Sequence, residues 1–248
     1  MKLKTIAFDL IGTLIHVMPQ REQMIKSLKE TLEKKGVILD EFDSVYEKAI
    51  TKYRTIRQER LKEVNSCTFI TDTLEKIGQQ DMKESLICDC VQAYFKPYLD
   101  SIMILKGTHE VLAILKESYS LGVITNFTCS NIVKSSLKKM KLLELFDHIV
   151  VSCEVGWRKP HPKIFRIYLK KAKAKSNEAI FIGDDLRRDI FGAQKVGMKA
   201  ILISAGITPT EDYYYHMQSD VFGIKPDHQI KSLTQLPEAL MEIHKLSQ

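Results

Sequence analysis

Residues 5–9 of the chain read Thr5-Ile6-Ala7-Phe8-Asp9, a short apolar run that ends in a carboxylate. A run of this length and composition is typical of a strand that is buried on both faces of a sheet. Similar runs recur later in the chain, with helix-like segments between them: Leu121–Ile124, Ile149–Val151, Ile180–Ile182 and Ala200–Ile203. This alternation predicts an α/β fold whose core is a doubly wound, Rossmann-like parallel sheet with helices on both faces.

A long segment between the first two runs has a different pattern. Over residues 21–95 the apolar residues recur at helical spacing and glycine is rare, which predicts four helices and no strand. We therefore expect a discontinuous core made of residues 1–15 and 100–248. A helical cap is inserted in it at residues 16–99, with a hinge at each end of the insert.

The overall composition is that of an ordinary globular protein, with 44% hydrophobic and 27% charged residues in 248. The longest apolar runs are far shorter than the roughly 18–20 residues of a membrane span. Five cysteines lie outside any CxxC or zinc-ligand spacing, so we expect reduced thiols and a cytoplasmic location. The net charge of +6 favours a small anionic partner. We expect no nucleic-acid partner, no membrane contact, and a monomer or homodimer.

Chemically useful residues directly follow the predicted strands. In open parallel sheets, ligands bind at the carboxyl ends of the strands. Up to four carboxylates at one edge would repel each other unless a cation lay between them, and a small set of oxygen ligands suits Mg²⁺. A carboxylate beside a metal ion and a lysine is a nucleophile suited to phosphoryl groups. The residues in question are Asp9, Thr125, Asn126, Lys159, Asp184, Asp185 and Asp189.

These residues stand in four segments that resemble the motifs of the haloacid dehalogenase-like hydrolase superfamily. Phe8–Leu14 resembles the first motif, hhhDxDGTL, and Ile124–Asn126 resembles the second, a hydroxyl residue after a strand. Gly156–Phe165 resembles the third, GxxKPxPxhF, and Phe181–Ala193 resembles the fourth, GDxxxxDhxGA. The resemblance covers essentially the whole chain, because the helical insert occupies the position of the C1-type cap of that superfamily.

The resemblance implies a role for each matching residue. Asp9 is the expected nucleophile, which forms an aspartyl intermediate. Lys159 stabilises the nucleophile and the transferring group, Thr125 and Asn126 bind that group, and Asp189 orients the lysine or a metal-bound water. The expected metal-site residues are Asp9 and Asp184 through their side chains, Ile11 through its carbonyl, and Asp185. The further expected substrate-binding residues are Gly12, Thr13 and Arg158.

Ile11 departs from the pattern of the superfamily's phosphatases, which carry a second Asp at this position. That Asp protonates the leaving oxygen and then activates water, and losing such a group typically costs about 10²–10⁴-fold in rate. Esters of ordinary alcohols would be affected most, and acyl phosphates, anhydrides and aryl phosphates least. His16, where the chain leaves the core, is a candidate replacement.

Three other functions compete with a Mg²⁺-dependent phosphohydrolase. A 2-haloacid dehalogenase also lacks the second Asp, but it carries a Tyr where this chain has Phe165, and Ser and Asn where this chain has an acidic pair. A phosphonoacetaldehyde hydrolase would use a cap lysine, here Lys48 or Lys52, to form a Schiff base. A binding or regulatory module would have lost the nucleophile, yet Asp9 and its partners are present.

Two further clusters carry hypotheses about partners. Arg54, Arg57 and Arg60 are spaced three apart, so they fall near one helical stripe that would bind an anionic leaving group if it faced the site. The run Tyr213-Tyr214-Tyr215-His216 would suit a dimer contact.

Overall fold

The computed structural model describes residues 2–18, 21–80, 82–204 and 223–245. The run at residues 213–216 lies outside these ranges. A six-stranded parallel sheet forms the centre of the molecule, in the order β5-β4-β1-β6-β7-β8. Its strands are β1 (Thr5–Phe8), β4 (Ser120–Thr125), β5 (His148–Val151), β6 (Ala179–Gly183), β7 (Lys199–Ile203) and β8 (His228–Ile230). The doubly wound α/β fold expected from the sequence is confirmed.

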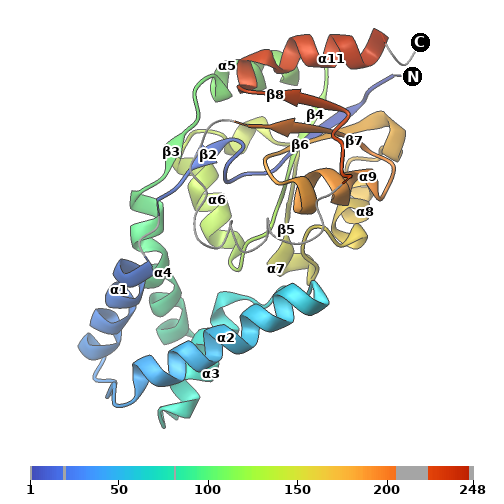
Figure 1. The fold of residues 1–248 in the computed structure, drawn as a ribbon. Coiled ribbons are helices and arrows are strands. Elements are labelled where there is room, and N and C mark those ends of the chain that lie inside the picture. Colours follow the sequence, from blue (N-terminus) through green and yellow to red (C-terminus); the bar gives the residue numbers. More distant parts are fainter. Residues whose placement is uncertain (1, 19–20, 81, 205–222, 246–248) are drawn as a thin grey trace.

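Helices cover both faces of this sheet (Figure 1). In β1, Ile6 and Phe8 face a core that includes apolar residues of α5, α6 and α11, whereas Ala7 faces a second core with α8. All three side chains are fully buried, because successive residues of a strand point to opposite faces and both faces are covered. The helices of this part are α5 (Thr108–Lys116), α6 (Ser130–Lys139), α7 (Ser152–Val155), α8 (Pro162–Lys171), α9 (Gly192–Gln194) and α11 (Leu236–Lys245).

Four helices form a separate group below the sheet in Figure 1. They are α1 (Arg21–Lys34), α2 (Phe42–Arg60), α3 (Ser66–Lys76) and α4 (Glu84–Asp100). Their apolar stripes face one another, and the buried aromatic rings of Tyr46, Phe69 and Phe95 belong to the shared core. A short antiparallel ribbon joins this group to the sheet, made of β2 (Ile15–His16) and β3 (Met103–Ile104).

Some local details differ from the sequence expectation. The ribbon β2–β3 and the edge strand β8 were not expected, because two or three residues are too few to show a period. Pro97 lies inside α4 rather than ending it. A π-helical turn, η3 (Leu186–Phe191), followed by α9, stands where one regular helix was expected. Such π turns are frequent at functional sites.

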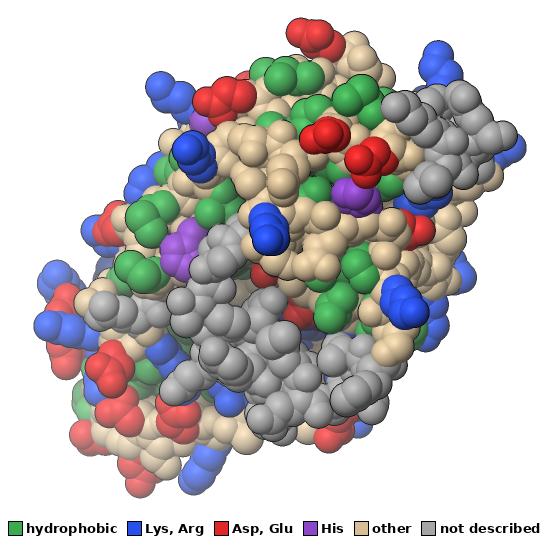
Figure 2. All heavy atoms as spheres, turned by 45° about the horizontal axis from the view of Figure 1, so that its top comes forward, with side chains coloured by type: hydrophobic (Ala, Val, Ile, Leu, Met, Phe, Trp, Pro, Cys, Tyr) green, Lys and Arg blue, Asp and Glu red, His purple; other side chains and the backbone are tan. Residues whose placement is uncertain are grey.

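The surface carries charges of both signs. On the face shown in Figure 2, Lys and Arg side chains are spread among acidic and apolar ones. In the described part of the chain, every helix is too short or too polar to span a bilayer.

Candidate active site

Asp9, Lys159 and Asp189 meet at the carboxyl edge of the sheet. Asp9 follows β1, and its backbone N–H continues the ladder by donating to Ile182 O at 2.8 Å. Lys159 Nζ lies 2.6 Å from Asp9 Oδ1 and 2.6 Å from Asp189 Oδ1. The lysine is 3% exposed, so burial alone would lower its pKa. The charges of Asp189 and Asp9 outweigh that effect and raise the pKa of Lys159, which therefore stays protonated.

Asp184 adds a third carboxylate to this group. One oxygen from each of Asp9, Asp184 and Asp189 lies within 4.8 Å of the others, an arrangement that can hold a metal ion. Burial and the charges of Asp9 and Asp189 raise the pKa of Asp184 well above its ordinary value. Burial is the largest cause, and repulsion by the other two carboxylates adds to it, as the sequence led us to expect.

Gly12 makes room for Asp184. It has a φ of +90°, and a Cβ at this position would lie 2.2 Å from Asp184 Oδ2. Two features of this position require glycine: its backbone is left-handed, and the Asp184 carboxylate lies too close for a Cβ. Gly12 therefore acts on the site through the space that it leaves, in addition to the substrate contact expected from the sequence.

Asn126 holds the backbone of Lys159, a contact that the sequence did not predict. Its Nδ2 donates to Lys159 O at 3.0 Å, and its Oδ1 accepts from Lys159 N–H at 2.7 Å. Both groups of the amide thus hold the lysine backbone, so the side chain positions Lys159. Thr125 ends β4 next to it and is 2% exposed.

Asp185, which was expected at the metal site, directs both carboxylate oxygens to Arg188. Its Oδ1 accepts from Arg188 N–H at 2.5 Å, and its Oδ2 lies 2.8 Å from Arg188 Nε. It therefore begins the π turn η3 as an N-cap and pairs with an arginine. Asp189 was expected to orient the lysine or a water; it lies against Lys159 Nζ at 2.6 Å and also belongs to the carboxylate group.

Two of the expected substrate-binding residues, Thr13 and Arg158, lie in different surroundings. Thr13 is 0% exposed and lies within the core turn that follows β1. Arg158 directs its guanidinium to Glu63, a residue of the α2–α3 connection. Of the expected arginine stripe, Arg57 likewise pairs with Glu63, at 3.1 Å, whereas Arg54 and Arg60 are exposed.

Ile11 occupies the sequence position of the absent acid, and His16 is the candidate replacement for it. Ile11 is half-buried, packs against the larger apolar core and pairs with Ile15 in an isolated β-bridge. His16 belongs to β2, where it pairs with Met103. Glu63 was not predicted from the sequence, because an isolated acidic residue in a helical insert carries no pattern that indicates a partner 95 residues away.

Comparison with known proteins places these features in a family. A family model described as haloacid dehalogenase-like hydrolase matches residues 6–203. A glyceraldehyde 3-phosphate phosphatase of Pyrococcus furiosus is 30% identical over 243 residues, covering 96% of this chain and 92% of that protein. The pyrophosphatase PpaX of Bacillus cereus is 29% identical over 209 residues, covering 82% of this chain and 84% of that protein.

The fold has a close match among solved structures. A 2-haloacid dehalogenase from Pseudomonas syringae superposes with a TM-score of 0.69 at 23% identity, over 97% of this chain and 99% of that one. At this level of identity the match establishes the fold and leaves the reaction open.

Proposed function

The chain belongs to the haloacid dehalogenase-like hydrolases, and on that basis we propose that it is a Mg²⁺-dependent phosphohydrolase. It acts through an aspartyl-phosphate intermediate on a small phosphorylated metabolite. The observation that carries this proposal is the charge at the site. Three clustered carboxylates face one lysine, which leaves an excess of two negative charges that one divalent cation would balance.

The donor set fits Mg²⁺. Carboxylate oxygens with further positions left for water and substrate are the usual ligands of this ion. Asp9 and Asp184 would hold it through their side chains and Ile11 through its carbonyl, with Asp189 beside them. When bound, the ion supplies positive charge to the oxygens of the transferring phosphoryl group.

Asp9 does the covalent chemistry in this proposal. Its carboxylate oxygen attacks phosphorus as the bond to the leaving oxygen breaks, and the phosphoryl group passes to Asp9. The protonated Lys159 donates to Asp9 and to the phosphoryl oxygens, whose charge it offsets. Water then attacks the aspartyl-phosphate, which releases inorganic phosphate and returns Asp9 to its starting state.

Ile11 narrows the substrate class. Its side chain cannot give a proton to the leaving oxygen, so substrates whose leaving group is already stable as an anion are favoured. Acyl phosphates, anhydrides and aryl phosphates have such leaving groups. One similar protein is named a pyrophosphatase, and pyrophosphate is an anhydride of this kind.

The competing functions fit the site less well. A haloacid is an anion, and the excess negative charge around Asp9 and Asp184 would repel it unless a metal ion were present. A Schiff-base lysine must lose its proton readily, yet hydrogen bonding to Tyr53 and the charges near it raise the pKa of Lys52. Lys48, the other candidate for a Schiff-base lysine, is exposed on the same helix.

Phosphate release tests the proposal. The purified chain is assayed with an aryl phosphate and an acyl phosphate, with Mg²⁺ and with EDTA, beside Asp9→Asn and the control Asp43→Asn on the exposed start of α2. We expect release that needs both Mg²⁺ and Asp9 and that survives the control substitution. Activity that is unaffected by Asp9→Asn would overturn the proposed nucleophile, and chloride release from 2-chloropropionate without metal would favour the dehalogenase function.

A further inference from the structure

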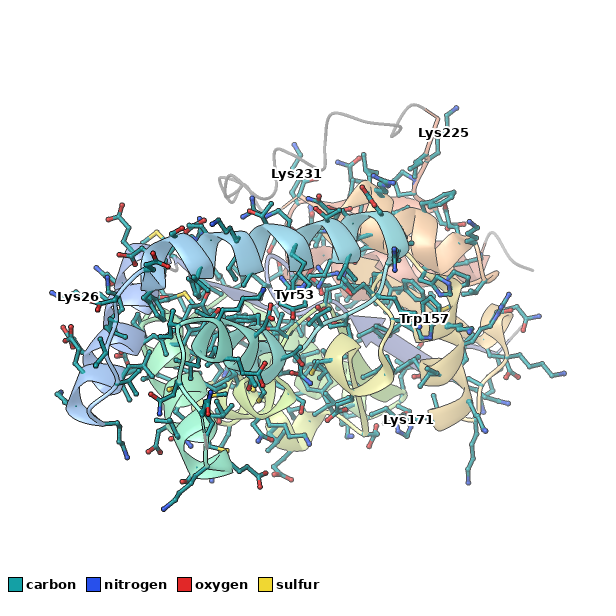
Figure 3. All side chains as sticks on the ribbon, turned by 90° about the horizontal axis from the view of Figure 1, so that it is seen from below. Lys26, Tyr53, Trp157, Lys171, Lys225 and Lys231 are labelled. Carbon is teal, nitrogen blue, oxygen red and sulfur yellow. The ribbon has the colours of Figure 1, made fainter. Side chains whose placement is uncertain are left out.

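The connection between α2 and α3 docks against the two core loops that carry Lys159 and Asn126. In Figure 3, Trp157 lies beside the end of α2, and Lys62 and Trp157 pair in an antiparallel β-bridge. Backbone hydrogen bonds flanking this bridge join the α2–α3 connection to the core loops. They run from Arg158 N–H to Leu61 O (3.0 Å), from Glu63 N–H to Gly156 O (3.2 Å) and from Ser66 N–H to Thr128 O (2.9 Å).

Glu63 is the centre of this junction. Its side chain is 0% exposed. The carboxylate accepts from Ser152 Oγ at 2.5 Å, lies 3.1 Å from Arg57 Nε, and pairs closely with the guanidinium of Arg158. Two half-buried guanidinium groups therefore share one buried carboxylate, so the negative charge of Glu63 is needed to hold both of them in place.

The partners of Glu63 lead to the reacting residues along two short routes. Arg158 directly precedes Lys159 in the chain. Ser152 Oγ accepts from Phe127 N–H at 2.9 Å, and Phe127 directly follows Asn126, whose amide clamps the lysine backbone. Both loops that carry the reacting groups are thus tied to one side chain that comes from the helical insert.

We propose that Glu63 is a positioning residue that couples docking of the α2–α3 connection to the placement of Lys159 and Asn126. The kinetic part of this inference rests on the proposed phosphohydrolase function. When the connection is docked, Glu63 holds Arg158 and Ser152, and the lysine points at Asp9. When it leaves, Arg158 loses its carboxylate partner directly beside the lysine, Ser152 loses its acceptor, and both loops loosen.

The variant Glu63→Gln tests this coupling, since it keeps the shape and removes the charge. We expect kcat with the aryl phosphate to fall on the order of 10²-fold, because a misplacement of about 1 Å at a reacting group has that effect. KM should change much less, since the binding determinants remain. The matched control is Glu59→Gln, an exposed glutamate on α2, which should keep both constants.

A second readout does not depend on activity. Amide hydrogen exchange should increase over residues 126–128 and 156–159 in Glu63→Gln, as well as over residues 61–66, and should not increase in the control. Trp157 is the sole tryptophan of the chain. Lys62 Nζ lies 3.5 Å from the centroid of its ring, and the ring stacks on that of His161 with 3.9 Å between the centroids. Its fluorescence should therefore shift when the connection undocks.

The outcomes separate the two proposals. If the wild type releases no phosphate but exchange spreads from residues 61–66 into both core loops, the phosphohydrolase function fails and the positioning role stands. If exchange rises in the connection alone, or kcat matches the control, the positioning role is overturned. Should Glu63→Gln fail to fold, Ser152→Ala removes one route with little change in shape, and it must then increase exchange at Phe127 and lower kcat by more than it changes KM.

Discussion

The substitution Gly12→Ala, compared with a control glycine, distinguishes two properties of Gly12. One is the left-handed backbone of the turn after β1, and the other is the space that the glycine leaves for the Asp184 carboxylate. The glycine has a φ of +90°, and an added Cβ would lie 2.2 Å from Asp184 Oδ2. Since a real Cβ contact is essentially never shorter than 3.0 Å, the carboxylate must retreat by about 0.8 Å or more. Asp184 is a short side chain that ends at the site, so the retreat is cheap in stability and moves a residue expected to hold the metal.

Gly36→Ala is the matched control. Gly36 has a φ of +78°, and a Cβ there would have no atom within 4 Å. Both substitutions therefore impose the left-handed strain of about 1–2 kcal/mol on alanine, and only Gly12→Ala adds the clash. We expect similar losses in the free energy of unfolding, measured in urea, for the two variants. Activity should fall by about 10²-fold in Gly12→Ala alone.

The comparison has a clear refuting result. If Gly12→Ala keeps activity within about threefold of Gly36→Ala, a 0.8 Å retreat of Asp184 has no consequence for the reaction, and the assignment of this carboxylate to the metal site is wrong. If Gly12→Ala instead lowers the free energy of unfolding far more than Gly36→Ala does, the clash is relieved by movement of the surrounding core and not by movement of the Asp184 side chain. Mg²⁺ titration of the activity of both variants distinguishes weakened metal binding from weakened chemistry.

Three more predictions concern the same edge of the sheet. Ile11→Asp should raise the rate with alkyl phosphates by about 10²–10⁴-fold, because it returns a proton donor to the leaving oxygen, and should raise the rate with aryl phosphates much less; equal gains would argue against a missing acid. Asp184→Asn should raise the Mg²⁺ concentration for half-maximal activity by at least about tenfold, whereas Asp185→Asn, which loses an arginine pair, should shift it little; the reverse order would restore Asp185 as a ligand. Burial, with the charge of Asp9, raises the pKa of Asp189 from its ordinary 3.8 to about 6, against the opposing charge of Lys159. The Asp189 carboxyl therefore binds more proton in the folded chain than in the unfolded one between these values, so its contribution to the free energy of unfolding without metal should rise as the pH falls through this window, and Mg²⁺ should flatten that contribution; the difference between thermal unfolding with and without Mg²⁺, from pH 7 to pH 4, checks the sign.

The sequence predicted the core of the fold because its signals are local. Each strand that the sequence predicted is a short apolar run, and the parallel pairing of β1 with β4 and β6 places Asp9 beside Thr125 and the turn after Gly183. The carboxyl ends of parallel strands meet at one edge whatever the details of packing. For this reason the meeting of Asp9, Lys159 and Asp184 at one edge was predictable from spacing and resemblance alone.

The roles of individual side chains were decided by the tertiary structure. Asp184 and Asp185 are neighbours in sequence, and only the turn of the backbone into η3 sends one to the carboxylate group and the other to Arg188. Asn126 holds the lysine backbone, and Arg158 holds Glu63 across 95 residues. These outcomes depend on side-chain direction and on contacts between distant segments. Local apolar periodicity carries no information about either.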